Sequence, residues 1–436
     1  MTVDPVRYDD YFPDRGDLSY DVIHYDLTLG YRIDSNRLRG RAVLRAVARA
    51  PLDQLELDLS GLMARKVEID AVPVARYGLK RDRLLVRIGK VIPAGAEFRI
   101  DVRYDGRPKP IRDGGDGMGW EELSDGVIVA GQTNGAPSWF PCNDRPSNKA
   151  TYRLSVTIPS AYHVVGNGML TERYRGASVT TWVYEELKPM ATYLATLQIG
   201  RYRAREVAGS PVPMTAVLSD RHVDRYHEAF ARQPEMMAYF IDTFGPYPFD
   251  GYTVVVTDDD LDIPLESQGL ATFGRNFLTA DWESVRLVAH ELAHQWFGNS
   301  LTLTDWSDIW LHEGFACYAE WLWSEKSGGP SAQDRALDHW RRLAAKPQDL
   351  ILGDPGPDDM FDDRVYKRGA LLLHALRLEV GELRFFQILR EWVSRHAYGS
   401  VTTPMFTALV DEICGASLDG LFKDWLWSGA LPALPR

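Results

Sequence analysis

Four segments in the first 160 residues alternate strictly between apolar and polar or small side chains. They are 23–33, 55–59, 98–104 and 152–158. In the first of them, the apolar residues are Ile23, Tyr25, Leu27, Leu29, Tyr31 and Ile33. A period of two predicts a strand with one buried face. Because Gly- and Pro-containing breaks separate the segments, residues 1–202 are predicted to form a mostly antiparallel β domain.

The period changes to a helical one in the second half of the chain. An amphipathic stretch at 223–244 stops at Gly245-Pro246, and a short apolar run at 252–256 predicts a buried strand. Further helices are expected at these positions: 281–298, 305–327, 364–380 and the last 50 residues. The predicted fold class is therefore α+β multidomain, with the β domain at 1–202 and a mainly helical domain at 203–436.

Length and composition favour a globular protein of more than one domain. The 436 residues are 45% hydrophobic and 25% charged, which is enough apolar material for sizeable cores. A net charge of −12 argues against nucleic acid as a main partner. We expect the three cysteines to be reduced thiols of a cytoplasmic protein. Neither a signal peptide in residues 1–20 nor a membrane span is visible, so no membrane partner is expected.

The strongest chemical signal is a His-Glu-x-x-His pattern in the helix predicted at 281–298. His290 and His294 are four residues apart, so both project from one helix face at a separation that suits one tetrahedral zinc ion. Glu291 lies about 100° further round the helix, where a carboxylate can act as general base without binding the metal. The alternative is two surface histidines on an ordinary helix.

Glu313 supplies a candidate third ligand. It lies on the helix predicted at 305–327, and a carboxylate from a neighbouring helix leaves the fourth zinc position open for water. The apolar character of the His290 helix also disfavours the surface alternative, because buried imidazoles need partners. The sequence therefore predicts one zinc ion per chain, held by His290, His294 and Glu313.

These residues and several further segments resemble the gluzincin aminopeptidase family, which includes aminopeptidase N and leukotriene hydrolase. The zinc signature is His-Glu-Leu-Ala-His-Gln-Trp-Phe-Gly-Asn at 290–299 with Glu313 after it. Similar segments occur in the family's order at 140–146, 189–194 and 244–248. The resemblance implies a saddle-like N-terminal β domain followed by a thermolysin-like catalytic domain.

The resemblance also implies roles for residues outside the zinc motif. Glu266 matches the glutamate that binds the substrate's free α-amino group, and Tyr366 matches the tyrosine that stabilises the oxyanion. Gln132 stands where the family has Glu or Gln beside that amine. Glu320 is expected to orient a zinc ligand. Leu265 is a candidate wall of the first side-chain pocket, which favours neutral or apolar first residues.

Three departures from the family pattern affect the interpretation. His312 replaces the usual Asn before Glu313, and we expect it to pack or to make a hydrogen bond, not to bind metal. Arg368 replaces the usual Lys after Tyr366. The chain ends soon after the catalytic helices, which resembles a short, two-domain form with a more open cleft.

The predicted function is a zinc aminopeptidase acting on peptides with a free N-terminus, with a monomer favoured. One alternative is a thermolysin-type endopeptidase, which shares the zinc motif but lacks amine capture. A non-catalytic interaction scaffold on the same fold is another, although His290, Glu291, His294, Glu313 and Tyr366 are all intact. Epoxide hydrolysis, known in one branch of the family that Gln132 resembles, is a minor alternative.

Overall fold

The computed structural model describes residues 9–70, 72–112 and 117–434. Packing contacts divide the chain into two compact units. The first comprises Met1–Arg205, Thr215–Arg221 and Phe249–Arg275; the second comprises Glu206–Met214, His222–Pro248 and Asn276–Arg436. A boundary at 202/203 assigns segments 215–221 and 249–275 to the second domain, whereas their contacts group them with the first unit. The domain boundary itself stays a prediction.

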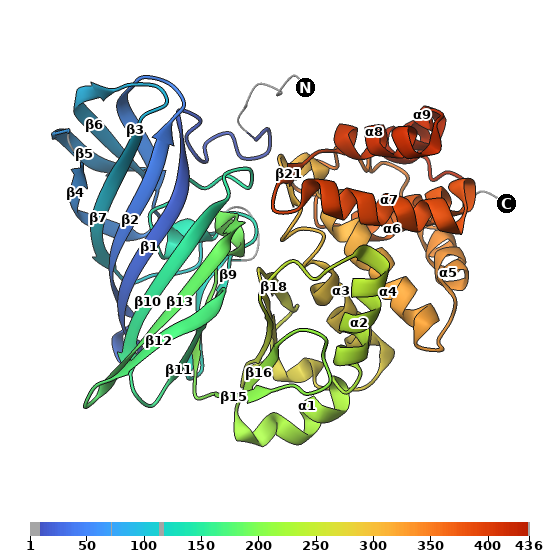
Figure 1. Ribbon diagram of the computed structural model, residues 1–436, viewed down its shortest axis with the longest axis horizontal. Helices are drawn as coiled ribbons and strands as arrows, with labels where there is room; N and C mark the ends of the chain where they lie inside the picture. Colours follow the sequence, from blue (N-terminus) through green and yellow to red (C-terminus); the bar gives the residue numbers. More distant parts are fainter. Residues whose placement is uncertain (1–8, 71, 113–116, 435–436) are drawn as a thin grey trace. The chain divides into compact units, whose positions relative to one another are not determined.

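The first unit is built from β-sheets (Figure 1). The seven-stranded sheet has the order β12 (Met169–Arg175), β13 (Val179–Met190), β10 (Ala150–Pro159), β1 (Tyr20–Arg32), β2 (Arg37–Ala48), β7 (Glu97–Gly106), β4 (Leu62–Ile69). A three-stranded sheet consists of β3 (Leu52–Asp58), β6 (Arg83–Ile92) and β5 (Val74–Lys80). A four-stranded sheet consists of β11 (His163–Gly166), β14 (Leu197–Gly200), β9 (Gly126–Ala130) and β8 (Gly119–Leu123). The predicted β domain is present, and β1 with β10 is a parallel pair within its mostly antiparallel pairing.

A further five-stranded sheet lies mostly in the first unit. Its order is β15 (Arg203–Glu206), β16 (Met214–Leu218), β17 (Tyr252–Val256), β19 (Leu270–Phe273), β18 (Leu265–Ser267). Strand β17 is the predicted buried strand at 252–256. Val255 and Leu270 of adjacent strands pack with Val165, Tyr202 and Val217 in one buried cluster, which explains why these strands group with the first unit.

Strand β1 shows where the alternation in the sequence misleads. Tyr25, Leu27, Leu29 and Tyr31 are buried as expected, but Ile23 is only half-buried. The register against β2 shifts between Val22 and His24, and such an irregularity changes which face the following side chains occupy. Val22 therefore takes the core position that the simple period assigns to Ile23.

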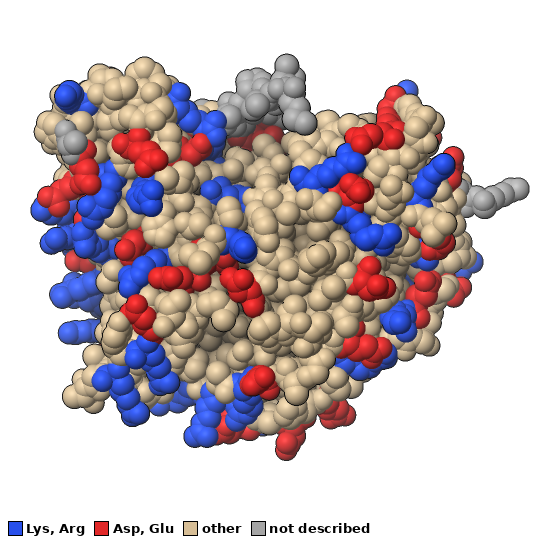
Figure 2. Space-filling model, viewed as in Figure 1, with Lys and Arg blue, Asp and Glu red and all other residues tan. Residues whose placement is uncertain are grey.

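The other face of the seven-stranded sheet carries charged side chains. In β2, buried positions such as Leu38 and Leu44 alternate with exposed arginines. Those arginines are Arg37, Arg39, Arg41 and Arg45. Figure 2 shows Lys and Arg side chains gathered over the strands of this unit at the left of the view. One face of the sheet thus packs into the core while the other is charged.

The second unit is mainly helical. Its helices are α1 (Val223–Ala229), α2 (Gln233–Phe244), α3 (Trp282–Ala293), α4 (Trp310–Lys326), α5 (Ala332–Ala344), α6 (Asp363–Val380), α7 (Glu382–His396), α8 (Thr403–Cys414) and α9 (Asp419–Trp427). Strands β20 (Thr302–Leu303) and β21 (Ser400–Val401) form a short parallel pair. Within the described ranges, no helix combines the length and the apolar composition needed to cross a bilayer.

Three of the predicted helices are interrupted or shortened, and the one predicted at 305–327 begins only at Trp310. The stretch predicted as one helix at 223–244 is divided into α1 and α2, and Pro234 lies in the first turn of α2. Proline is accepted in a first turn but disrupts a helix interior, so the chain breaks just before it. The helix predicted at 281–298 ends at Ala293, and Gly298 follows with a φ of 118°.

Helices α4 and α6 approach each other closely at a pair of glycines. A Cβ atom on Gly369 would lie 2.7 Å from the Cα of Gly314, and one on Gly314 would lie 2.8 Å from the Cα of Gly369. The two backbones therefore touch without intervening side chains. Glu313 precedes one glycine directly and Tyr366 lies one turn before the other, so this contact positions both candidate site residues.

Arg368 fastens the C-terminal segment to α6. Its buried guanidinium donates hydrogen bonds to main-chain carbonyls of these residues: Leu350, Asp424, Trp425, Ser428, Gly429 and Ala430. A lysine has fewer donors and lacks the planar fork. Arg368 therefore makes structural contacts that a lysine at this position could not all make.

We expect Arg368→Lys to destabilise the protein by about 2–4 kcal/mol, since buried carbonyls lose their donors. Urea unfolding followed by tryptophan fluorescence measures the loss. Arg390→Lys, which changes an exposed arginine of α7, is the matched control and should have no measurable effect. A shift no larger than that of the control would contradict the anchoring role.

Candidate metal centre

Helix α3 presents both predicted histidine ligands from one buried face. The helix begins at the N-cap Asp281, whose carboxylate accepts a hydrogen bond from the Ser284 amide. His290 and His294 follow on consecutive turns, and they are only 6% and 1% exposed. Their burial excludes the alternative of two surface histidines.

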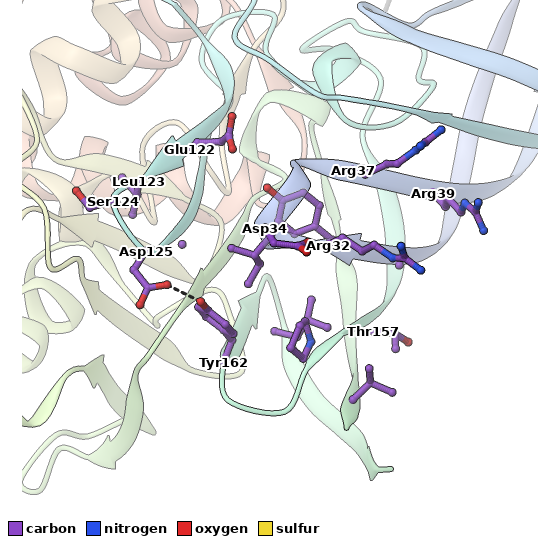
Figure 3. A pocket seen from close by; sticks show the side chains of 17 residues that line it. Arg32, Asp34, Arg37, Arg39, Glu122, Leu123, Ser124, Asp125, Thr157 and Tyr162 are labelled. Atoms are coloured by element: carbon purple, nitrogen blue, oxygen red, sulfur yellow. Dashed lines mark hydrogen bonds between the residues drawn. The ribbon is translucent and has the colours of Figure 1, made fainter. Parts of the chain in front are cut away.

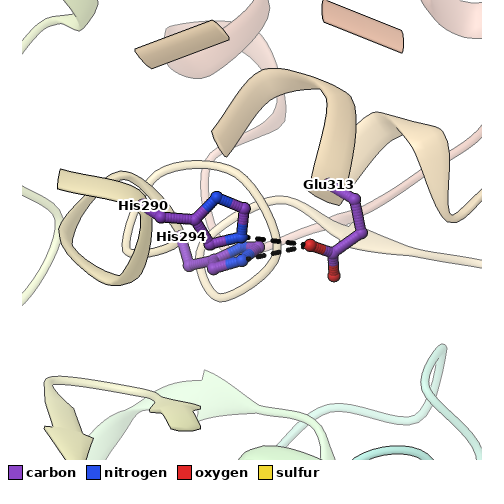
Figure 4. A group of neighbouring side chains, drawn as sticks. All are labelled: His290, His294 and Glu313. Atoms are coloured by element: carbon purple, nitrogen blue, oxygen red, sulfur yellow. Dashed lines mark hydrogen bonds and ion pairs between the residues drawn. The ribbon is translucent and has the colours of Figure 1, made fainter. Parts of the chain in front are cut away.

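Glu313, in the first turn of α4, meets both imidazoles (Figure 4). Its Oε2 atom lies 3.2 Å from Nε2 of His290 and 3.5 Å from Nε2 of His294. Zinc bonds of about 2.05 Å in a tetrahedral arrangement separate neighbouring ligand atoms by about 3.3 Å. Both distances from Glu313 therefore match a tetrahedral zinc site, and all three ligand atoms lie within 4.8 Å of one another.

The hydrogen bonds of the other ring nitrogens, Nδ1, support the same assignment. Nδ1 of His290 donates to Oε1 of Glu320 at 2.8 Å, and Nδ1 of His294 donates to the Phe297 carbonyl at 3.0 Å. With both Nδ1 protons held in this way, the Nε2 lone pairs are directed to the space beside Glu313. This donor set of two neutral imidazoles and a carboxylate suits zinc.

Charges at the centre are tightly balanced in the metal-free chain. Burial alone would lower the pKa of His290, but hydrogen bonds to Glu313 and Glu320 outweigh it and raise the pKa to about 9. Burial would likewise raise the pKa of Glu313, yet the two histidines hold it well below its usual range. A proton therefore occupies the metal-free group at neutral pH.

This proton makes zinc affinity depend on pH. Because His290 is protonated below about pH 9 in the metal-free chain, zinc must displace that proton, and we expect the apparent affinity to rise about tenfold per pH unit between pH 7 and 9. Above pH 9 the dependence should flatten. Competition with a fluorescent chelator, corrected for the chelator's own protonation, measures it. An affinity that does not change over this range would contradict the assignment.

Two further predicted residues lie around the same group. Glu291 is adjacent to His290 on α3 and is 4% exposed. The half-buried Tyr366 on α6 places its ring nearly parallel to the His290 imidazole, with centroids 5.9 Å apart and an interplanar angle of 23°. The second unit therefore brings together the predicted base, the predicted oxyanion tyrosine and the metal ligands.

His312 does not take part in the metal group. It is 1% exposed, and its Nε2 accepts a hydrogen bond from the Leu303 amide at 2.8 Å. This bond ties the start of α4 to strand β20. The expectation that His312 packs or forms a hydrogen bond agrees with this contact.

The remaining predicted residues belong to the first unit. Leu265 and Glu266 lie in β18, where Glu266 pairs with Ala271 of β19, and both are half-buried. Gln132 follows β9, and its Nε2 atom is buried with no hydrogen-bond partner among the described residues. Their predicted contacts with substrate stay predictions.

A large cavity of the first unit is separate from all these residues. It has a volume of about 940 Å³ and lies between the β1–β2 connection and the loop after β8 (Figure 3). Arginines line one part, including Arg32, Arg37 and Arg39, while Asp125 bonds to Tyr162 in another. No predicted site residue lines it.

Comparison with known proteins identifies the class. Residues 22–194 match the Peptidase M1 N-terminal domain and residues 228–425 match the Peptidase family M1 domain. A two-domain M1 zinc metallopeptidase mutant bound to L-tryptophan is similar over 98% of this chain and 99% of its own, with a TM-score of 0.90 and 31% identity. An M1 zinc metallopeptidase from Deinococcus radiodurans covers the same shares, with a TM-score of 0.89 and 32% identity.

A β-rich domain followed by a helical domain with a buried His-His-Glu group defines a two-domain zinc metallopeptidase. The chain belongs to peptidase family M1. The predicted family, the predicted fold class and the predicted single catalytic zinc ion are thereby confirmed.

Curated relatives are longer. Aminopeptidase M1-D of Oryza sativa subsp. japonica is 25% identical over 94% of this chain and 50% of its own length. Leucyl aminopeptidase of Saccharolobus solfataricus is 26% identical over 71% of this chain and 42% of its own. The chain thus spans about half the length of the curated relatives it matches.

Sequence reasoning missed several residues around the centre. The Phe297 carbonyl is a main-chain group and leaves no signal in a sequence motif. The sequence does show Arg286 one turn before His290 and Lys367 directly after Tyr366. Neither belongs to a zinc pattern, and only the packing of α3, α4 and α6 reveals them.

Proposed function

We propose that the protein is a zinc-dependent aminopeptidase that hydrolyses the first peptide bond of peptides with a free N-terminus. The observation that carries the proposal is the convergence of His290 Nε2, His294 Nε2 and Glu313 Oε2, with both Nδ1 atoms bonded elsewhere. Such a group is built to hold a catalytic metal with an open position. The family relationship adds the reaction class.

The residues of the second unit divide the chemistry among them. When bound, zinc supplies Lewis-acid polarisation and makes water more acidic. Glu291 takes the proton of the attacking water on its carboxylate and passes it to the leaving amine. The Tyr366 hydroxyl donates a hydrogen bond to the developing oxyanion.

Residues of the first unit are proposed to recognise the N-terminus. Glu266 pairs with the α-ammonium group, which restricts cleavage to the first bond. The Gln132 side chain assists through its amide oxygen, which can accept a hydrogen bond from the ammonium group. Leu265 contributes to the pocket for the first side chain.

Substrate preference follows from the same proposal. Solved relatives include mutants bound to L-tryptophan, to a Tyr-Ser-Ala substrate and to L-arginine. The L-tryptophan and Tyr-Ser-Ala complexes agree with the neutral or apolar preference proposed here, whereas the third mutant was solved with a cationic amino acid bound. A cytoplasmic location and a monomeric state stay predictions from the sequence.

Glu266→Ala tests the exopeptidase assignment. We expect kcat/KM for leucine fluorogenic amides to fall about 10- to 100-fold, because a charge-assisted bond of about 1.5–3 kcal/mol is lost, while any cleavage of acetylated peptides is unchanged. Glu68→Ala, an exposed glutamate of β4, is the control. If the wild-type chain cleaves acetylated and free peptides equally, the endopeptidase alternative is correct.

A further inference from the structure

A buried carboxylate behind the metal group lies close to two cations as well as to the histidine that it orients. Glu320 of α4 is 2% exposed and accepts the Nδ1 proton of His290 through Oε1. Its other oxygen, Oε2, faces Arg286 of α3, whose Nη1 lies 3.4 Å away. A single carboxylate thus joins a metal ligand to a cation on the same helix as that ligand.

Lys367 of α6 brings a second cation to the same place. It is 8% exposed, and its Nζ donates to Sγ of the buried Cys317 at 3.3 Å. Cys317 lies one turn before Glu320 on α4. Burial would raise the pKa of Glu320, but the charge of Lys367, the hydrogen bond and charge of His290 and the charge of Arg286 together outweigh it, and the pKa falls to about 2.

Each of the two cations also pairs with a second carboxylate, whose attraction is screened by solvent. Nearby carboxylates are exposed: Glu283 lies 2.9 Å from Arg286, and Asp363 lies 4.0 Å from Lys367. The other titratable and charged groups that act on the cluster are Arg335 and His339 of α5 and Cys317 of α4. Burial, followed by Lys367, lowers the pKa of His339 to about 4, so His339 is neutral at pH 7.

We propose that Arg286 and Lys367 are positioning residues that act through Glu320, limiting how strongly His290 donates to zinc and so keeping the metal centre electrophilic. A carboxylate that accepts from a zinc-bound histidine makes that imidazole a stronger donor. Arg286 in contact with this carboxylate and Lys367 close to it oppose this effect, and their positive charge also opposes a nearby dication. The inference rests on the proposed zinc function.

The sign of each effect follows from charge. Removing one cation lets Glu320 act more fully on His290 and lessens repulsion of the metal, so zinc should bind more tightly. The same change makes the centre less electrophilic, so the acid limb of the kcat/KM–pH profile should move to higher pH and kcat should fall. Tighter metal binding with weaker catalysis is not expected from a residue that only fills space.

Lys367→Met is the principal test. We expect the zinc dissociation constant, measured by chelator competition, to fall about tenfold, and the acid limb to rise by about one pH unit. Lys367→Arg should restore both values to within about threefold of the wild type. Cys317→Ala removes the thiol but keeps both cations, so it should leave the dissociation constant unchanged.

Arg286→Gln provides the second measurement and should act in the same direction with smaller effects, because the Arg286 side chain is 27% exposed. It also carries the test if Lys367→Met does not fold. A weaker or unaltered zinc affinity in folded variants overturns the proposal. Since chelator competition needs no turnover, failure of peptide hydrolysis in the wild type would count against the proposed function alone.

Discussion

Glu291→Gln is expected to bind zinc as tightly as the wild-type chain while kcat for aminoacyl amides falls by about 10³- to 10⁴-fold. The amide keeps the size of the carboxylate but cannot accept the proton of the attacking water. Glu291 is not one of the three proposed ligands, so metal content should stay at one zinc per chain. Steady-state kinetics together with metal analysis of the same sample provides the measurement.

A matched change at Glu379, an exposed glutamate of α6, controls for the substitution itself. Glu379→Gln should retain full activity. Two outcomes would refute the role assigned to Glu291: residual turnover within about tenfold of wild type, or loss of zinc along with activity.

Gly369→Ala is expected to lower the free energy of unfolding by about 3 kcal/mol or more and to weaken zinc binding as well. The added methyl group would lie 2.7 Å from a backbone atom of α4, which cannot move aside as a flexible side chain could. Moving α4 away from α6 shifts Glu313 relative to the histidines, so the metal group is disturbed together with the packing. Denaturant unfolding of the metal-free and zinc-loaded forms separates the two effects.

Gly420→Ala in α9 is the control for this substitution. A Cβ atom at Gly420 meets nothing within 4 Å, so the change should be neutral or stabilising by up to about 1 kcal/mol, as expected for glycine in a helix. If the two alanine variants had equal stability, close packing of α4 on α6 would not be the reason for the glycine pair.

Much of the fold was predictable because the period of apolar residues along the chain indicates each strand or helix locally. Alternating residues in β7 and β10 are buried as their period indicates, since successive side chains of a strand point to opposite faces. The prediction that Ile23 faces the core was wrong, because the register shift at this point depends on the partner strand β2. Helix α5 was missed, although Ser331 and Asp334 form a capping box that the sequence displays as Ser-x-x-Asp.

The grouping of the three candidate metal ligands was predictable for a similar reason. The His290–His294 spacing is a property of one helix, so local geometry is enough to place both rings on one face. Glu313 needed a second helix, and here the family resemblance supplied what spacing could only suggest. No pattern in the sequence indicated that Arg286 and Lys367 lie near Glu320, because the three residues belong to three different helices.

The sequence by itself determined the strand and helix periods, the pair of histidines and the family. Tertiary structure alone decided that Nε2 rather than Nδ1 of each histidine faces Glu313, that two glycines let α4 and α6 touch, and that two cations lie close to one buried glutamate. The physical reason is the distance along the chain over which each kind of interaction acts. Period and spacing are set within a few residues, whereas hydrogen-bond partners and desolvated charges depend on groups that are distant along the chain.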